Sequence, residues 1–596
     1  MKSSYRAPER IPCLNPCLPS RSAYKETMRQ PYEDELLQIA RHLHCINIIA
    51  RIDTPTSTGN EETMGFIELL LEKFSLSRFF LTITGVWTAV FIVGRIREHQ
   101  KIKSLGSYGP SLKPLLPFGL DFIYYGARAT FRQQTFALWR DVLFSQFWTI
   151  EMRVLNERVC FTADPENIKA VLATQFQDFG KGKRFHDEWY DFLGDSIFTI
   201  DGTPWHDTRQ LLRPQFSRDR VSDLYCFEKH VQVLFKAIAN GGPLDWETQL
   251  VDPSRADGRR VDIKDLFFRF TLDASADFLL GTDFKSLTNP QHTLMNSFNE
   301  VQRIQNIMVR TPLMGWFISK EPFYSGIRDI ENLVYPIIQR VLSMTPDQLA
   351  AHTKSDRDYT LLHELAGFTR DPKLIRDQIF AILLAGRDTT ASTLSFAMYE
   401  LSRHPEVVTR LRSEILATVG THQLPTYEHL KEMPYLRAIL NETLRLYPPV
   451  PFNVRVALKD TTLPRGGGPD GTLPLSVPQN TRVGYSTLVM QRRPDLYPPV
   501  SETFADPAIF SPERWAVWHP RPHEFIPFNA GPRFCLGQQF ALTEMGYTLC
   551  RVFQRFDRVQ NFMHEIDGGE LQLKTDIVLT PAQGVHVAFW EAKNDQ

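Results

Sequence analysis

The chain has 596 residues, of which 43% are hydrophobic, and its 67 basic and 68 acidic side chains leave a net charge of -1. This length is ample for a large buried core, while the balanced charge and the lack of a long basic block argue against nucleic-acid binding. The seven cysteines are scattered and odd in number, so they do not predict a disulfide framework. We therefore expect most of the chain to lie in a reducing compartment.

The first 77 residues are expected to form a partly disordered extension, because Pro, Ser and Arg are frequent up to residue 65. One stretch of this extension, residues 32–51, places its leucine and isoleucine residues roughly on one helical face. It predicts a short surface helix, with a helix lying on a membrane as the alternative.

Residues 79–94 are the only long uncharged apolar run, and Arg78 and Arg95 flank it. As a helix this run would span about 24 Å, and the two arginines can snorkel to make up the remaining thickness of a bilayer. The residues after the run carry more Lys and Arg than those before it, which places the bulk of the chain in the cytoplasm. We expect a single-pass anchor over residues 78–95, with a buried core helix as the alternative.

Residues 96–120 contain Pro110, Pro114 and Pro117 together with several glycines. This composition predicts a stiff hinge between the anchor and the rest of the chain. We expect residues 121–596 to form one mainly helical domain.

A turn-rich loop ends near Pro204 and leads into a helical stretch with Trp205 and Arg209. Residues four apart share one face of a helix, so both side chains can donate to a carboxylate of one cofactor. A structural cation–π pair is the alternative, and it is the commoner one for two such residues alone.

Residues 371–404 are predicted to form one long helix, with Asp371 as its cap and His404-Pro405 at its end. Its centre reads Ala385-Gly386-Arg387-Asp388-Thr389-Thr390, which is a cluster of weak helix formers. Such a cluster often marks a functional bulge or kink. An ordinary polar helix face is the alternative.

Residues 434–446 form a further predicted helix, in which Glu442 and Arg445 share a face. If both are buried, they need a third partner to complete their hydrogen bonds, and Arg514 offers one. A surface ion pair is the alternative. The prolines of residues 447–455 then indicate extended chain.

One loop places a cysteine between glycines and directly before a helix-compatible stretch: Phe528-Asn529-Ala530-Gly531-Pro532-Arg533-Phe534-Cys535-Leu536-Gly537. Backbone N–H groups and the positive end of a helix that begins near Leu536 would favour the thiolate form of Cys535. Gly531 and Gly537 allow a flat cofactor to approach closely. We therefore predict a thiolate metal ligand, with a buried small hydrophobe as the alternative.

The pattern Phe-x-x-Gly-x-Arg-x-Cys-x-Gly over residues 528–537 resembles the haem-binding loop of the cytochrome P450 family. The motifs at residues 205–209, 385–390 and 442–445 precede it in the order that the family has, and the resemblance covers roughly residues 105–590. It implies the cytochrome P450 fold, a single large mainly α domain with a small β-rich part, here behind an N-terminal transmembrane helix. It also implies a haem-thiolate monooxygenase that uses O2.

The resemblance further implies roles for single residues. Cys535 is the axial ligand of the haem iron, and the haem b is non-covalent because Ala385 replaces the Glu to which some related enzymes link it. Asp388 and Thr389 relay protons to the site of oxygen activation. The expected structural network is Glu442, Arg445 and Arg514.

Two larger sets of contacts complete the expected site. The cofactor-binding set is Cys535, Trp205, Arg209, Arg455, Arg533 and Phe528. The substrate-lining set is Phe198, Phe452, Val454 and Ala385.

Electrons must come from a separate protein, because no strand-to-helix unit carries a glycine fingerprint for flavin or nicotinamide. The resemblance implies NADPH-cytochrome P450 reductase as this partner, with cytochrome b5 as a second candidate. A hydrophobic small-molecule substrate and membrane lipid are the other expected partners, and nucleic acid is not. The implied location is the endoplasmic reticulum membrane, with the catalytic domain in the cytosol.

Several stretches, among them residues 197–202, 212–216 and 463–468, look like the fungal branch that hydroxylates n-alkanes and fatty acids. We therefore expect hydroxylation of long-chain aliphatic substrates at or near the terminal carbon. Two departures are Ser196, where the branch usually has Gly, and the long extension before the anchor. The alternatives are secondary metabolism with a polycyclic or other hydrophobic substrate, rearrangement of a peroxide, and a non-enzymatic membrane haem protein.

Overall fold

The computed structural model of the chain describes residues 76–245, 256–310, 318–351 and 359–592. The expected extension up to residue 75, with its helix over residues 32–51, lies outside the described residues. Two units follow one another along the chain, residues 1–91 and residues 92–596.

The first described element is α3 (Leu76–Leu105), which contains the apolar run. Its apolar window has a mean hydropathy of 1.8 and no buried residue. Among the described residues it is the one helix long and apolar enough to cross a membrane, which is consistent with the expected anchor. The helix continues into the first part of the expected hinge, because no proline interrupts the sequence before Pro110.

The second unit is mainly helical. Its α-helices are α4 (Leu120–Phe131), α5 (Thr135–Ala137), α6 (Pro165–Lys169), α7 (Gly182–Leu193), α8 (Gly202–Leu212), α9 (Arg218–Val221), α10 (Tyr225–Asn240), α11 (Ile263–Leu280), α12 (Thr293–Arg310), α13 (Glu321–Leu342), α14 (Pro346–Ala351), α15 (Leu361–Phe368), α16 (Pro372–Leu401), α17 (Pro405–Thr418), α18 (Tyr427–Lys431), α19 (Pro434–Leu446), α20 (Thr487–Met490), α21 (Gln538–Arg555) and α22 (His564–Asp567).

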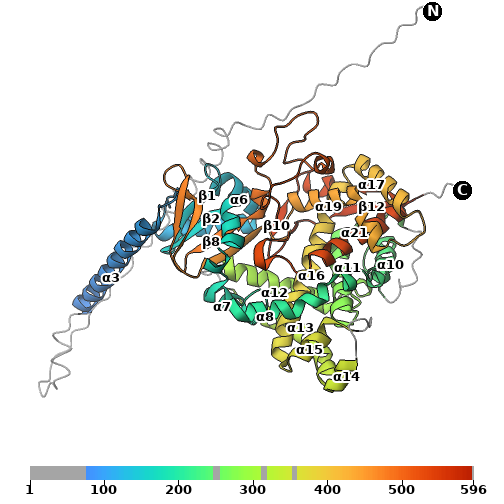
Figure 1. Cartoon of the computed structure of the whole chain (residues 1–596), viewed down its shortest axis with the longest axis horizontal. Helices are drawn as coiled ribbons and strands as arrows, with labels where there is room; N and C mark the ends of the chain where they lie inside the picture. The colour runs from blue at the N-terminus through green and yellow to red at the C-terminus, as the bar shows by residue number, and fades with distance from the viewer. Residues whose placement is uncertain (1–75, 246–255, 311–317, 352–358, 593–596) are drawn as a thin grey trace, which may run out of the picture. The chain divides into compact units, whose positions relative to one another are not determined.

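The strands of this unit form small sheets, of which the largest has five strands in the order β1-β2-β8-β5-β3. Figure 1 shows β1, β2 and β8 side by side. The strands of this sheet are β1 (Thr149–Val154), β2 (Glu157–Thr162), β3 (Phe179–Gly180), β5 (Phe452–Ala457) and β8 (Arg482–Ser486). The smaller sheets are formed by β4 (Arg260–Asp262), β12 (His586–Glu591) and β9 (Phe556–Asn561), by β6 (Thr461–Gly467) and β7 (Leu473–Val477), and by β10 (Leu573–Thr575) and β11 (Leu579–Pro581). The expected mainly α fold with a small β part is confirmed.

α16 lies at the centre of the helical part, where it packs against α11, α13, α19 and α21. Its cap is Asp371, whose side chain accepts a hydrogen bond of 2.9 Å from the backbone N–H of Lys373, as the sequence predicts. Within residues 375–401 only Ala385, Gly386 and Thr389 are not fully buried. The weak helix formers of residues 385–390 remain α-helical without the expected bulge, because the packing of α16 against its neighbouring helices outweighs their propensity.

The structure brings Glu442, Arg445 and Arg514 together in a buried network. Arg445 donates two hydrogen bonds of 2.8 Å to the Glu442 carboxylate, and Arg514 donates one of 2.9 Å. Trp515 and the backbone of Ser511 complete the set of donors to this carboxylate. Burial alone would raise the pKa of Glu442, but the two guanidinium groups outweigh it and hold this pKa below its ordinary value.

The substitution Glu442→Gln is expected to destabilise the fold, because it leaves two buried guanidinium groups without a counter-charge. The free energy of unfolding in urea should fall by about 3–5 kcal/mol. The matched control is Glu300→Gln, which removes the partner of the exposed Arg303 and should change this free energy by at most about 1 kcal/mol. Equal losses in the two variants would contradict a structural role of the network.

Candidate active site

A cavity of about 280 Å³ lies beside α16 and in front of the loop that carries Cys535. Most of its wall is apolar, and it includes Ile197, Leu212 and Ile382. The predicted site residues that line it are Phe198, Trp205, Arg209, Ala385, Thr389, Arg455, Phe528, Arg533 and Cys535. The structure therefore places most of the expected cofactor-binding set around one space.

Cys535 faces this cavity from the turn before α21. Its backbone N–H donates a hydrogen bond of 2.9 Å to the carbonyl oxygen of Phe528, which folds the loop back on itself. Gly531 has a φ of +66°, and a Cβ atom there would meet the carbonyl oxygen of Leu172 at 1.7 Å, so no other residue fits this turn. The geometry of the loop presents the sulfur to the cavity.

Opposing influences act on the thiol of Cys535. Burial raises its pKa above the ordinary value, although a backbone hydrogen bond from Gly537 and the Arg209 guanidinium both act to lower it. The expected thiolate at the start of the helix stays a prediction. A bound metal cation is what favours the deprotonated sulfur.

Cationic side chains gather on one wall of the cavity: Lys181, Arg209, Arg455 and Arg533. The carboxylate among them is Asp201, which lies 2.5 Å from Arg533. Burial and the charges of Arg455 and Arg533 lower the pKa of Lys181 well below its ordinary value. Burial likewise lowers the pKa of Arg533 to about 10, with Asp201 opposing.

This wall is short of negative charge and of hydrogen-bond acceptors. The Nε atom of Arg533 is buried and has no hydrogen-bond partner among the described residues. Trp205 packs against the same guanidinium, with 4.5 Å between the Arg533 carbon and the ring centroid. A planar cofactor with two carboxylates, such as haem with its propionate groups, fits these donors and the apolar wall beside them.

Sequence reasoning missed Lys181, which is part of this cationic wall. Its amino group lies 3.4 Å from the side-chain oxygen of Asn453. The sequence carried one signal for it, a lysine between Gly180 and Gly182 directly before a helix. Gly182 has a φ of +75°, which is a conformation that favours glycine and turns the chain at this point.

Asp388 and Thr389 face different spaces although they are adjacent. Thr389 lines the cavity, and its hydroxyl donates a hydrogen bond of 2.6 Å to the carbonyl oxygen of Ala385. Asp388 is not part of the wall formed by the described residues; it pairs with Arg387 at 2.8 Å and lines a second, more polar cavity. Burial raises the pKa of Asp388, although the charge of Arg387 opposes this.

The two predicted substrate contacts on β5, Phe452 and Val454, alternate with the strand residues that line the cavity. Asn453 and Arg455 line the cavity, whereas the ring of Phe452 packs on Trp139 with 4.2 Å between the centroids. Val454 is likewise not part of the wall formed by the described residues. Alternate residues of a strand face opposite sides, so the structure brings Phe198 and Ala385 to the cavity and leaves Phe452 and Val454 outside it.

Comparison with known proteins agrees with the geometry. Residues 133–584 match the family model for cytochrome P450. The cytochrome P450 monooxygenase pvhE of Talaromyces variabilis is 53% identical over 533 residues, which are 89% of this chain and 98% of that protein. Cytochrome P450 52A13 of Debaryomyces hansenii is 40% identical over 74% of this chain and 81% of its own length. Cytochrome P450 52A1 of Candida tropicalis is 39% identical over 78% of this chain and 85% of its own length.

A solved structure, the haem domain of cytochrome P450DA, has the same fold with a TM-score of 0.65. It is 20% identical and covers 82% of this chain and 99% of its own length. The chain therefore belongs to the cytochrome P450 family. It is a monooxygenase with haem b as its cofactor, and it uses O2 and electrons from a reductase.

The substitution Lys181→Met is expected to weaken haem retention, because it removes one donor from the cationic wall. A hydrogen bond to a charged group is worth about 1.5–3 kcal/mol, so haem should dissociate about tenfold faster or more. The rate is measured by transfer of haem to an excess of apomyoglobin. The matched control is Lys183→Met in the same segment, whose amino group is exposed and paired with Asp187; equal rates in both variants would contradict a role of Lys181.

Proposed function

We propose that the chain hydroxylates long-chain aliphatic substrates, n-alkanes or fatty acids, at or near the terminal carbon. This proposal rests on the positions of the stretches that look like the alkane and fatty-acid hydroxylases. Residues 197–202, 212–216 and 385–390 all contribute side chains to the cavity wall, through Ile197, Phe216 and Ala385 among others. The parts of the sequence that look like the alkane and fatty-acid hydroxylases are thus parts that would contact the substrate.

Hydroxylation at a terminal carbon requires a narrow channel that presents the methyl group to the reacting centre. Subterminal C–H bonds are weaker than those of a methyl group, so they react first unless the wall keeps them away from the reacting centre. Phe198 and Ile382 are bulky apolar side chains in this wall. We assign this narrowing role to Phe198.

A second candidate function is oxidation of a hydrophobic secondary metabolite. One observation favours it: the relative at 53% identity is not one of the 52A proteins, which reach about 40%. The chain is thus more similar to a monooxygenase outside that group than to the 52A members named above.

We assign a separate role to each group of residues in the site. Bound haem supplies the activation of O2 with two electrons from the reductase. Cys535 holds the iron, and the cationic wall with Lys181, Arg455 and Arg533 holds and orients the carboxylates of the cofactor. Thr389 passes a proton into the cavity from its hydroxyl, and Asp388 holds the next proton on the polar side of α16.

The location and the partners follow from the same proposal. α3 anchors the chain in the endoplasmic reticulum membrane, with the second unit in the cytosol, where NADPH-cytochrome P450 reductase can reach it. Cytochrome b5 is a second electron donor. Extraction of membranes with alkaline carbonate tests the anchor. The full chain should stay in the membrane, and a chain without residues 1–95 should be extracted.

The proposed function is tested by turnover of the full chain with reductase, NADPH and a panel of n-alkanes, fatty acids and sterols. Mass spectrometry of the products should find terminal alcohols from the aliphatic substrates. The variant Phe198→Ala should raise the share of subterminal alcohol, because it widens the cavity wall.

The matched control is Phe452→Ala, which removes a ring that packs on Trp139 outside the cavity wall and should leave the product ratio unchanged. Product from sterols alone would support secondary metabolism instead. Product from a peroxide without reductase would support rearrangement, and no product from any substrate would support a non-enzymatic haem protein.

A further inference from the structure

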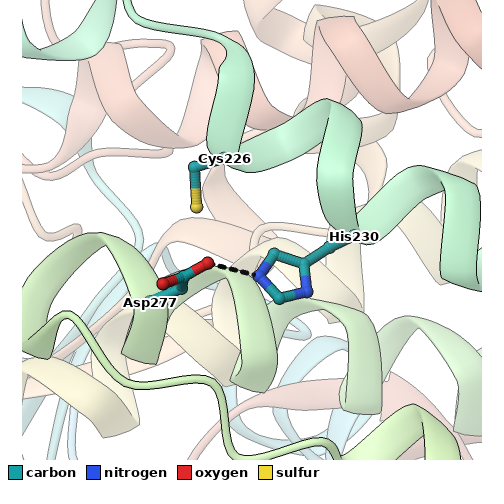
Figure 2. Close-up of side chains that lie close together, drawn as sticks. All are labelled: Cys226, His230 and Asp277. Carbon is teal, nitrogen blue, oxygen red and sulfur yellow. Dashed lines mark hydrogen bonds and ion pairs between the residues drawn. The ribbon is translucent and has the colours of Figure 1, made fainter. Parts of the chain in front are cut away.

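A cluster of metal-ligating side chains lies between α10 and α11. Its members are Cys226 and His230 on α10 and Asp277 on α11, and their donor atoms all lie within 4.8 Å of one another. Figure 2 shows the sulfur and the imidazole directed toward the Asp277 carboxylate. None of the three lines the active-site cavity formed by the described residues, so the family's reaction does not account for the cluster.

The backbone holds these donors in place before any ligand is present. Cys226 and His230 are four residues apart and share one face of α10, and that face packs against α11. His230 is buried, and its Nε2 atom lies 2.9 Å from Oδ2 of Asp277. The sulfur of Cys226 makes a long contact of 3.5 Å with the carbonyl oxygen of Ala274.

The charge around this cluster favours a cation. A second group, His230 with Asp273 and Asp283, meets the same distance limit, so three carboxylates surround one imidazole. Asp273 already accepts hydrogen bonds from the backbone of Ser286 and Leu287. The partners of Asp277 are instead the side chains of Lys229 and His230, which can move when a metal binds.

A lysine at present supplies the positive charge. The amino group of Lys229 lies 2.7 Å from Asp277 and 3.5 Å from Asp283. Its side chain is 40% exposed, so this ammonium group sits at the rim of the cluster and can swing out into solvent. The side chain of Asp277 is itself 22% exposed, so an ion and a water molecule can reach it from solvent.

We propose that Cys226, His230 and Asp277 bind one Zn²⁺ ion, with water as the fourth ligand. Thiolate, imidazole and carboxylate are the ligand types that zinc takes in proteins. Neighbouring donors on a tetrahedral zinc ion stand about 3.4–3.6 Å apart. The three donor atoms lie within 4.8 Å of one another, and Nε2 of His230 is 2.9 Å from Oδ2 of Asp277, so zinc binding requires this pair to move slightly apart. Binding forms the zinc–sulfur bond, releases the thiol proton to solvent and displaces the ammonium group of Lys229.

A metal at this place would join two helices behind the cysteine loop. On the same turn of α10, Glu228 accepts hydrogen bonds from Tyr547 at 2.6 Å and from Arg551 at 2.9 Å, both on α21. α21 is the helix that follows Cys535. The zinc site is therefore a structural clamp on the cysteine side of the domain and not a second catalytic centre.

The test is equilibrium dialysis of the haem-loaded full chain against a Zn²⁺ buffer, with bound zinc counted by mass spectrometry of the metal. The wild-type chain should bind one equivalent. The variant Cys226→Ser should bind it about tenfold more weakly or worse. The variant Lys229→Met should bind it more tightly, because no ammonium group then competes for Asp277.

The matched control is His186→Gln, which removes a surface imidazole 2.8 Å from Asp195 and 3.7 Å from Asp187, in a cluster without a thiol. It should leave the affinity for the first equivalent unchanged. Equal affinity of wild type and Cys226→Ser, or no tightening in Lys229→Met, would overturn the proposal. If Cys226→Ser does not fold, the zinc affinity of Lys229→Met decides, because the Lys229 side chain is partly exposed.

Discussion

The constraint on which this structure depends is an excess of positive charge on one wall of the central cavity. Lys181, Arg209, Arg455 and Arg533 share that wall, and Asp201 is the carboxylate paired with Arg533 among the described residues. Cations that are partly withdrawn from water and short of counter-charge favour a bound anion. The two propionate groups of haem b supply this negative charge.

The opposite side of the cavity has the same dependence on the cofactor. Burial raises the pKa of Cys535, and a bound metal cation favours its deprotonated form. α16 faces the same cavity, where Ala385, Gly386 and Thr389 interrupt its buried surface over residues 375–401.

The sequence predicted what depends on local motifs. The cap of the long helix at Asp371 and the pairing of Glu442 with Arg445 follow from short-range chemistry. The contact of Glu442 with the distant Arg514 followed from the family resemblance. The sequence could not predict which way a side chain faces. Consecutive residues of a helix point about 100° apart, so Thr389 faces the cavity while Asp388 faces away. On β5 the choice between Phe452 and Asn453 was set by the pairing with β8, and a shift by one residue would have reversed it.

Cys535 would hold the haem iron, and the carbon monoxide difference spectrum tests this role most directly. The reduced wild-type chain should show the long-wavelength Soret band of a haem–thiolate carbonyl complex. Cys550 is buried outside the cavity wall, so Cys550→Ser should keep that band, whereas Cys535→Ser should lose it. Retention of the band in Cys535→Ser would contradict the account.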